Sequence, residues 1–208
     1  MLDVICFCLL LLAIVVLGIW ALNSLLKIIS IRSPWESPQR VAGKRGEAYA
    51  KSIIRTVIKE DDFWIKNLSL EVEGQRTEFD NIIVNSGGIF IIEVKNYVGE
   101  LIGSEDEYEW IKKKTTSEHA YIKHVKNPIK QVKRQIYILS QFLKKNDVSV
   151  WINGYAFLVH GNSPVNSEMV LSTTEDIDKA IHGTKVKGFT ESKKRKVIKL
   201  LERLSERK

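Results

Sequence analysis

The stretch GIFIIEVK, residues 88–95, decides how the rest of the chain is read. It is a nearly continuous apolar run, rich in β-branched residues and too short for a typical helix, so it predicts a buried central strand. Alternate side chains of a strand share a face, so Glu93 and Lys95 point one way and Val94 points into the opposite core. Two charged residues in such a strand require an explanation.

A second apolar strand at residues 77–85 precedes this run, and a Ser-Gly-Gly turn joins the two. Antiparallel pairing can bring Asp80 alongside Glu93. Two close carboxylates repel unless a cation lies between them, and Mg²⁺ prefers such hard oxygen ligands. A lysine beside that ion can position water and stabilise charge on a phosphate. The alternative is that Glu93 and Lys95 form an exposed ion pair on an edge strand, although the apolar flanks disfavour a solvated edge.

Working outward, the spacing of apolar residues and turn signals predicts an α/β fold with a single soluble domain. Asn127 and Pro128 are a strong helix start, with Asn as the cap and Pro in the first turn. The expected elements are a helix at 41–59, strands at 63–70, 77–85 and 89–95, a short extended stretch between Gly99 and Gly103, a surface hairpin around 107–113, a helix from 127 to 143, a strand at 148–159, a short helix near 174–181, and a basic amphipathic helix at 191–208. This last helix is expected to pack against the domain, the alternative being a membrane or nucleic-acid contact.

Taken together, these segments resemble the nuclease-related domain (NERD) family, a member of the PD-(D/E)xK nuclease superfamily. The resemblance spans roughly residues 43–159. It rests on GKRGE at 43–47, EFDNIIV at 78–84, GIFIIEVKNYVG at 88–99, Trp110, and Asn127-Pro128 with Gln131. It implies a restriction-endonuclease-like mixed β-sheet flanked by helices.

The resemblance also implies a role for each matching residue. Asp80 and Glu93 would be metal ligands, the Val94 carbonyl a third ligand, and Lys95 the catalytic lysine. Glu47 looks like the superfamily's first-helix acid, which binds a second metal or holds a metal-bound water. Gln131 is similar to a glutamine that neighbours the active site in many relatives, the alternative being a cap or surface residue.

The implied activity is metal-dependent hydrolysis of phosphodiester bonds, in DNA more often than RNA, with Mg²⁺ or Mn²⁺ as cofactor. The alternative is a non-catalytic, membrane-tethered module that binds nucleic acid or a protein. The net charge of +7 fits an anionic partner, either nucleic acid or a lipid headgroup surface, the alternative being that it serves only solubility and membrane topology. Within the chain, Trp110 with Lys112, Lys113 and Lys114 is the candidate nucleic-acid contact. His119 and His124 do not have the spacing of a helical zinc site and are interpreted as surface residues.

The segment Val4–Leu22 carries no charged residue and, as a helix, would be about 28 Å long, close to the thickness of a bilayer core. It predicts a transmembrane anchor at 1–26, followed by a juxtamembrane linker at 27–40, a nuclease-like domain at 41–165 and a helical extension at 166–208. Cationic residues after the span favour an external N-terminus and a cytoplasmic domain. A cleaved signal peptide is the alternative, but no basic segment precedes the span. Cys6 and Cys8 lie within it, so the remainder can form neither a disulfide nor a thiolate zinc site.

Overall fold

The computed structural model describes residues 15–24, 38–115 and 120–206, and the side chains of residues 38–45, 47 and 120 lie outside this description. The chain divides into two compact units, residues 1–41 and 42–208. Both β-sheets and the candidate site belong to the second unit.

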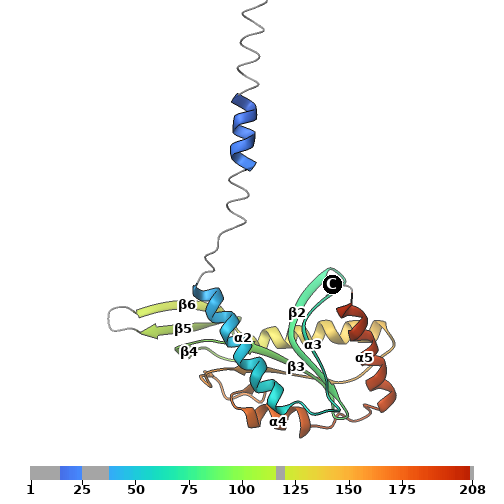
Figure 1. The fold of residues 1–208 in the computed structure, drawn as a ribbon. Helices are drawn as coiled ribbons and strands as arrows, with labels where there is room; N and C mark the ends of the chain where they lie inside the picture. Colours follow the sequence, from blue (N-terminus) through green and yellow to red (C-terminus); the bar gives the residue numbers. More distant parts are fainter. Residues whose placement is uncertain (1–14, 25–37, 116–119, 207–208) are drawn as a thin grey trace, which may run out of the picture. The chain divides into compact units, whose positions relative to one another are not determined.

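A five-stranded mixed sheet forms the centre of the second unit (Figure 1). In spatial order its strands are β1 (Phe63–Val72), β2 (Gln75–Asn85), β3 (Gly88–Lys95), β7 (Ile152–Leu158) and β8 (Val170–Leu171). The first three pair antiparallel, whereas β7 pairs with β3, and β8 with β7, in parallel. A parallel neighbour requires a crossover connection, which α3 (Pro128–Lys145) provides between β3 and β7. The predicted central strand is therefore confirmed.

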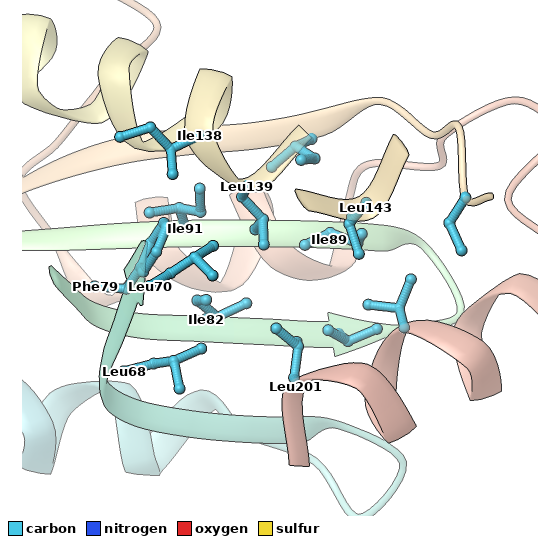
Figure 2. Close-up of a cluster of buried hydrophobic side chains, with 14 of the residues drawn as sticks. Leu68, Leu70, Phe79, Ile82, Ile89, Ile91, Ile138, Leu139, Leu143 and Leu201 are labelled. Atoms are coloured by element: carbon cyan, nitrogen blue, oxygen red, sulfur yellow. The ribbon is translucent and has the colours of Figure 1, made fainter. Parts of the chain in front are cut away.

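Helices cover both faces of this sheet. On one face, α3 and α5 (Glu191–Ser205) pack on the strands; in Figure 2, Ile138, Leu139 and Leu143 of α3 lie over β3, and Leu201 of α5 joins the same cluster. On the other face lie α2 (Pro38–Val57) and α4 (Thr174–His182). Each fully buried aliphatic or aromatic side chain of this size contributes about 1.5–3 kcal/mol of transfer free energy. The burial fixes which face of β3 carries Glu93 and Lys95, because they alternate with Val94.

In the sequence, the segment between β3 and α3 forms a separate three-stranded antiparallel sheet. Its strands are β4 (Glu100–Ile102), β5 (Glu109–Thr115) and β6 (Ala120–Lys126). The buried Asn127 amide donates hydrogen bonds to the carbonyls of Ser104, Glu105 and Glu107 at 2.8–3.2 Å. Its side-chain oxygen meanwhile accepts from the backbone N–H of Ile129 and caps α3. One residue thus ties the loop before β5 to the start of α3.

The α/β class, with a mixed sheet flanked by helices, is confirmed, as are the cap at Asn127 and the packing of the C-terminal helix through Val197 and Leu201. Strands β6 and β8 were not expected from the sequence. Strand β7 begins at Ile152, later than predicted, because Val148 is a buried loop residue that packs in the α3 face of the core. Helix α2 begins at Pro38, inside the predicted linker, and proline is well tolerated at the first position of a helix.

The first unit contains a described helix at residues 15–24, and its apolar side chains are exposed, with Leu17 at 64 % and Trp20 at 71 %. Within the described ranges, no helix is both long enough and apolar enough to cross a membrane. Residues 4–14 of the predicted span lie outside those ranges. The described residues therefore give the predicted transmembrane helix no support, and it stays a prediction.

Candidate functional site

Asp80 lies where β2 separates from both of its neighbours. On one side, the β1–β2 register passes from Lys66↔Asn81 to Leu68↔Phe79, and Asn67, with a left-handed φ of 52°, stands across from Asp80. On the other side, the β2–β3 ladder ends at Asn81↔Ile92, one step before Asp80 would meet Glu93. The space that two strands leave when they diverge is where side chains can converge on a ligand.

The side-chain alternation changes phase at the same point. In β1, Ile65 and Leu68 face the same core cluster although they are three positions apart, a spacing that would place them on opposite faces of a regular strand; in β2, Phe79 and Ile82 do so as well. A residue in the left-handed region, here Asn67, interrupts the pleat, so the side chains after it point to the opposite faces from those that regular alternation would give. Sequence patterning did not reveal this change of phase.

A backbone hydrogen bond fixes the Asp80 carboxylate against β3. The N–H of Val94 donates to Asp80 Oδ2 at 2.8 Å. The backbone pairing of β2 with β3 ends at Ile92, and two residues later this side-chain contact takes its place. It holds the Asp80 carboxylate near Glu93, where antiparallel pairing was expected to bring it.

The Glu93 carboxylate is buried, with 2 % exposure, and three side chains donate to it. Oε1 accepts from Lys95 Nζ at 2.6 Å and from Gln131 Nε2 at 2.7 Å. Oε2 accepts from Gln135 Nε2 at 2.7 Å. The ion pair of Glu93 and Lys95 is therefore internal to the fold, which rules out the alternative of an exposed pair on an edge strand.

Burial raises the pKa of Glu93 above its usual value; Lys95 opposes this shift, and the nearby Asp80 adds to it. Burial alone would lower the pKa of Lys95, but Glu93, Tyr97 and Asp80 together raise it. The pKa of the Tyr97 hydroxyl is raised by burial. Titratable groups whose pKa values are perturbed together at one place are a mark of functional sites.

Gln131 was expected near the site and is there, whereas Gln135 was missed. The two are one helical turn apart on α3 and both reach Glu93, because residues i and i+4 lie on the same face of a helix. Gln135 is fully buried and also donates to the carbonyl of Glu78 in β2 at 2.8 Å. The signal that could have found it is the repeated glutamine at helical spacing on an otherwise apolar face.

The motif at 43–47 approaches the end of β3 through its second glycine. A Cβ on Gly46 would lie 2.3 Å from the Cβ of Asn96, so only glycine allows α2 to pass this close. Glu47 follows directly in α2, and its side chain is outside the described residues. Its predicted role at a metal stays a prediction.

The expected nucleic-acid contact at Trp110 is wrong. Trp110 is fully buried with Leu101, Ile129 and Leu158, and its indole N–H donates to the Ser104 carbonyl. A ring enclosed in this way cannot stack on a base; the lysine-rich neighbourhood suggested exposure, but β5 turns the tryptophan inward.

The lysines that follow Trp110 lie on β5 and are partly or fully accessible. Burial, with Lys123 across the hairpin and Lys114 beside it, lowers the pKa of Lys112. Lys113 pairs loosely with Glu100, at 4.0 Å. His124 is exposed and faces Glu109, in agreement with a surface histidine, and His119 lies outside the described residues.

The donor set can be tested for its fit to a metal. Within the described residues, no three His, Cys, Asp or Glu side chains gather closely enough to hold an ion. The predicted set here has two carboxylates, Asp80 and Glu93, together with the Val94 carbonyl. Mg²⁺ is commonly bound by one or two carboxylates, with waters and substrate phosphates completing the shell, so this set suits Mg²⁺ and does not suit a closed structural site.

Comparison with known proteins identifies relatives of this arrangement. The model of the nuclease-related domain family matches residues 42–159, which is more than half of the chain. An uncharacterized protein of Bacillus anthracis is 30 % identical over 92 residues, which are 40 % of this chain and 43 % of that protein. The chain therefore spans less than half of that relative's length. No solved structure matches.

Proposed function

The chain belongs to the nuclease-related domain family, and on this premise we propose that it is a metal-dependent nuclease that hydrolyses phosphodiester bonds in DNA. The observation that carries the proposal is the meeting of Asp80, Glu93 and Lys95 where β2 and β3 diverge, with both carboxylates oriented by hydrogen bonds. A purely structural ion pair would not require a second acid at the same place.

In this mechanism Asp80, Glu93 and the Val94 carbonyl would hold Mg²⁺ or Mn²⁺. The ion, when bound, supplies a Lewis acid for the phosphate and a water of lowered pKa. Glu93 reaches it in a fixed orientation because Gln131 and Gln135 hold its two oxygens, and such supporting contacts raise both affinity and rate.

Lys95 carries the positive charge beside the reacting phosphate. In the metal-free site Glu93, Tyr97 and Asp80 raise its pKa, and its proposed role is to stabilise charge on the phosphate and to position water. Glu47 is proposed as the further acid near the metal; the close contact of Gly46 with Asn96 supports this, since it brings the backbone of α2 to the end of β3.

The test is cleavage of supercoiled and single-stranded DNA by the full-length chain with Mg²⁺, Mn²⁺ or EDTA. Asp80→Asn and Lys95→Met should each lower the rate by at least about 100-fold. Asp178→Asn is the matched control, because Asp178 is half exposed and pairs with His182 on α4, remote in sequence from the site. Cleavage that persists in EDTA or in Asp80→Asn would contradict the assignment. Nucleic-acid binding without any cleavage would favour the non-catalytic module.

We also propose that residues 4–22 anchor the chain in a membrane with the domain in the cytoplasm. The support is the uncharged run in the sequence and the cationic residues that follow it. Protease treatment of intact cells and of inverted vesicles distinguishes the orientations, because a cytoplasmic domain is digested only in the inverted vesicles.

A further inference from the structure

A groove of about 760 Å³ runs beside the candidate site. Its walls come from three places: the start of β2, the segment around the start of β5 with the end of β6, and the first turns of α3. Gln131 is part of both the groove and the candidate site, because it lines the groove and donates a hydrogen bond to Glu93. The groove therefore leads to the carboxylate at which the reaction is proposed to occur.

The lining of the groove is cationic. Arg76, Lys126, Lys130 and Arg134 face it, against the carboxylates of Glu78 and Glu109. The ion pairs formed by these cations are loose, at 3.8 Å for Arg76 with Glu78 and 3.7 Å for Lys130 with the exposed Asp106. Exposed pairs at such distances contribute little and can exchange for phosphate contacts.

One large aromatic ring stands at this groove. Tyr108 is 84 % exposed, and the Lys130 ammonium lies 6.0 Å from the centre of its ring. Its backbone is held in place, because the Tyr108 carbonyl accepts from the N–H of Asn127 at 3.0 Å. An exposed ring on a fixed backbone next to cations suits a nucleotide, because the base can stack on the ring while the neighbouring cations contact the phosphate.

We propose that this groove binds an unpaired nucleic-acid strand, with one base stacked on Tyr108 and phosphates held by Lys130 and its cationic neighbours. The inference rests on the proposed nuclease function, in that it supplies the strand to be cut. An unpaired strand is favoured over a duplex because stacking requires a free base face, which base pairs buried in a duplex do not offer. Tyr108 thus takes the role that the sequence had assigned to Trp110.

Binding of a fluorescent oligothymidine strand to the full-length chain in EDTA, followed by anisotropy, tests the groove without any cleavage. Tyr108→Ala should weaken binding by about tenfold, whereas Tyr108→Phe keeps the parent affinity, because stacking needs the ring and not the hydroxyl. The matched control is Tyr137→Ala, an exposed tyrosine on α3 outside the groove. Equal affinities of Tyr108→Ala and Tyr137→Ala would overturn the proposal.

A second pair of variants tests the charge. Lys130→Ala should lower the magnitude of the slope of log affinity against log salt by about 1, the value expected for the loss of one phosphate contact. Lys144→Ala, at an exposed lysine farther along α3, should leave the slope unchanged. A duplex of the same length should bind more weakly than the strand; tighter duplex binding would overturn the preference for an unpaired strand.

The two proposals fail separately. If Tyr108-dependent binding is found but no cleavage follows with Mg²⁺, the groove stands and the nuclease falls. If the protein cleaves DNA at a rate that depends on Asp80 but Tyr108→Ala binds and cleaves as the parent does, the nuclease stands and the groove is rejected.

Discussion

The Nε2 atom of Gln135 lies 2.7 Å from Glu93 Oε2 and 2.8 Å from the carbonyl of Glu78, so a single buried amide connects β3 to β2 where these strands separate. The connection comes from a third element, α3, which crosses over the sheet between β3 and β7. The orientation of the site's central carboxylate therefore depends on helix packing and not only on the strand that carries it.

Replacing this amide should disturb both the site and the fold. Gln135→Met keeps the volume but removes both hydrogen bonds, and we expect metal-dependent cleavage to fall by about 10–100-fold. The free energy of unfolding should also fall, by about 1–3 kcal/mol, because the change leaves the buried Glu93 Oε2 and the Glu78 carbonyl without this donor. Removal of Gln135 Oε1, which has no hydrogen-bond partner among the described residues, offsets part of this cost. Gln141→Met on the same helix is the control. Parent-like cleavage by Gln135→Met would show that Glu93 does not need this support.

Stabilisation by Mg²⁺ should increase with pH. Burial raises the pKa of Glu93, so the carboxylate loses its proton, and becomes able to bind a metal, at a higher pH than an ordinary glutamate. The shift in Tm between saturating Mg²⁺ and EDTA should therefore grow from about pH 5 to about pH 8. Glu93→Gln should show no such growth. A shift that is constant over this range would contradict a raised pKa at a metal ligand.

In the metal-free protein, the raised pKa of Glu93 should also change how the free energy of unfolding depends on pH. Because the folded protein binds the Glu93 proton more tightly than the unfolded chain does, this residue contributes stability below its ordinary pKa, and the contribution is lost as pH rises through the raised value. In EDTA, the slope of unfolding free energy against pH above about 4.5 should be more negative for the parent than for Glu93→Gln. Urea titrations at several pH values measure it.

Gly46→Ala should destabilise the protein, although the same change in most helices stabilises it by about 1 kcal/mol. The added Cβ would lie 2.3 Å from Asn96, and we expect a cost of about 1–3 kcal/mol in unfolding free energy. Asn96→Gly removes the opposing Cβ, so the double variant should recover part of the loss. Recovery measured by urea denaturation would locate the clash, and a stabilised Gly46→Ala would show that α2 can move away.

His182, at the end of α4, connects this helix to Asp62 in the loop before β1. Its Nδ1 lies 2.6 Å from Asp178 and its Nε2 lies 3.0 Å from Asp62, whose side chain is 2 % exposed. His182→Ala would leave the buried Asp62 charge with fewer partners, at a cost of about 2–3 kcal/mol. Asp178→Ala, at a half-exposed position, should cost less than about 1 kcal/mol. Cleavage below the melting temperature should remain parent-like in both variants, which separates this cluster from the catalytic site.

Sequence patterns were sufficient to predict the strand at 88–95, the helix start at Asn127, and Asp80, Glu93 and Lys95 as neighbouring candidate residues. These follow from local rules: a short apolar run with β-branched residues is a buried strand, Asn followed by Pro starts a helix, and a tight turn brings two strands antiparallel. The family resemblance assigned Gln131 to the site, and the Glu93 contact agrees with it.

Other features of the site could not be predicted from local patterns, because they depend on how distant elements pack. The separation of β2 from both neighbours at Asp80 and the second glutamine at Gln135 arise from contacts between elements far apart in the chain. The exchange of Trp110 for Tyr108 as the accessible ring has the same origin, since composition makes both plausible and only packing buries one of them. Local periodicity specifies which residues can form an element, whereas burial and long-range hydrogen bonds specify which side chains reach the site.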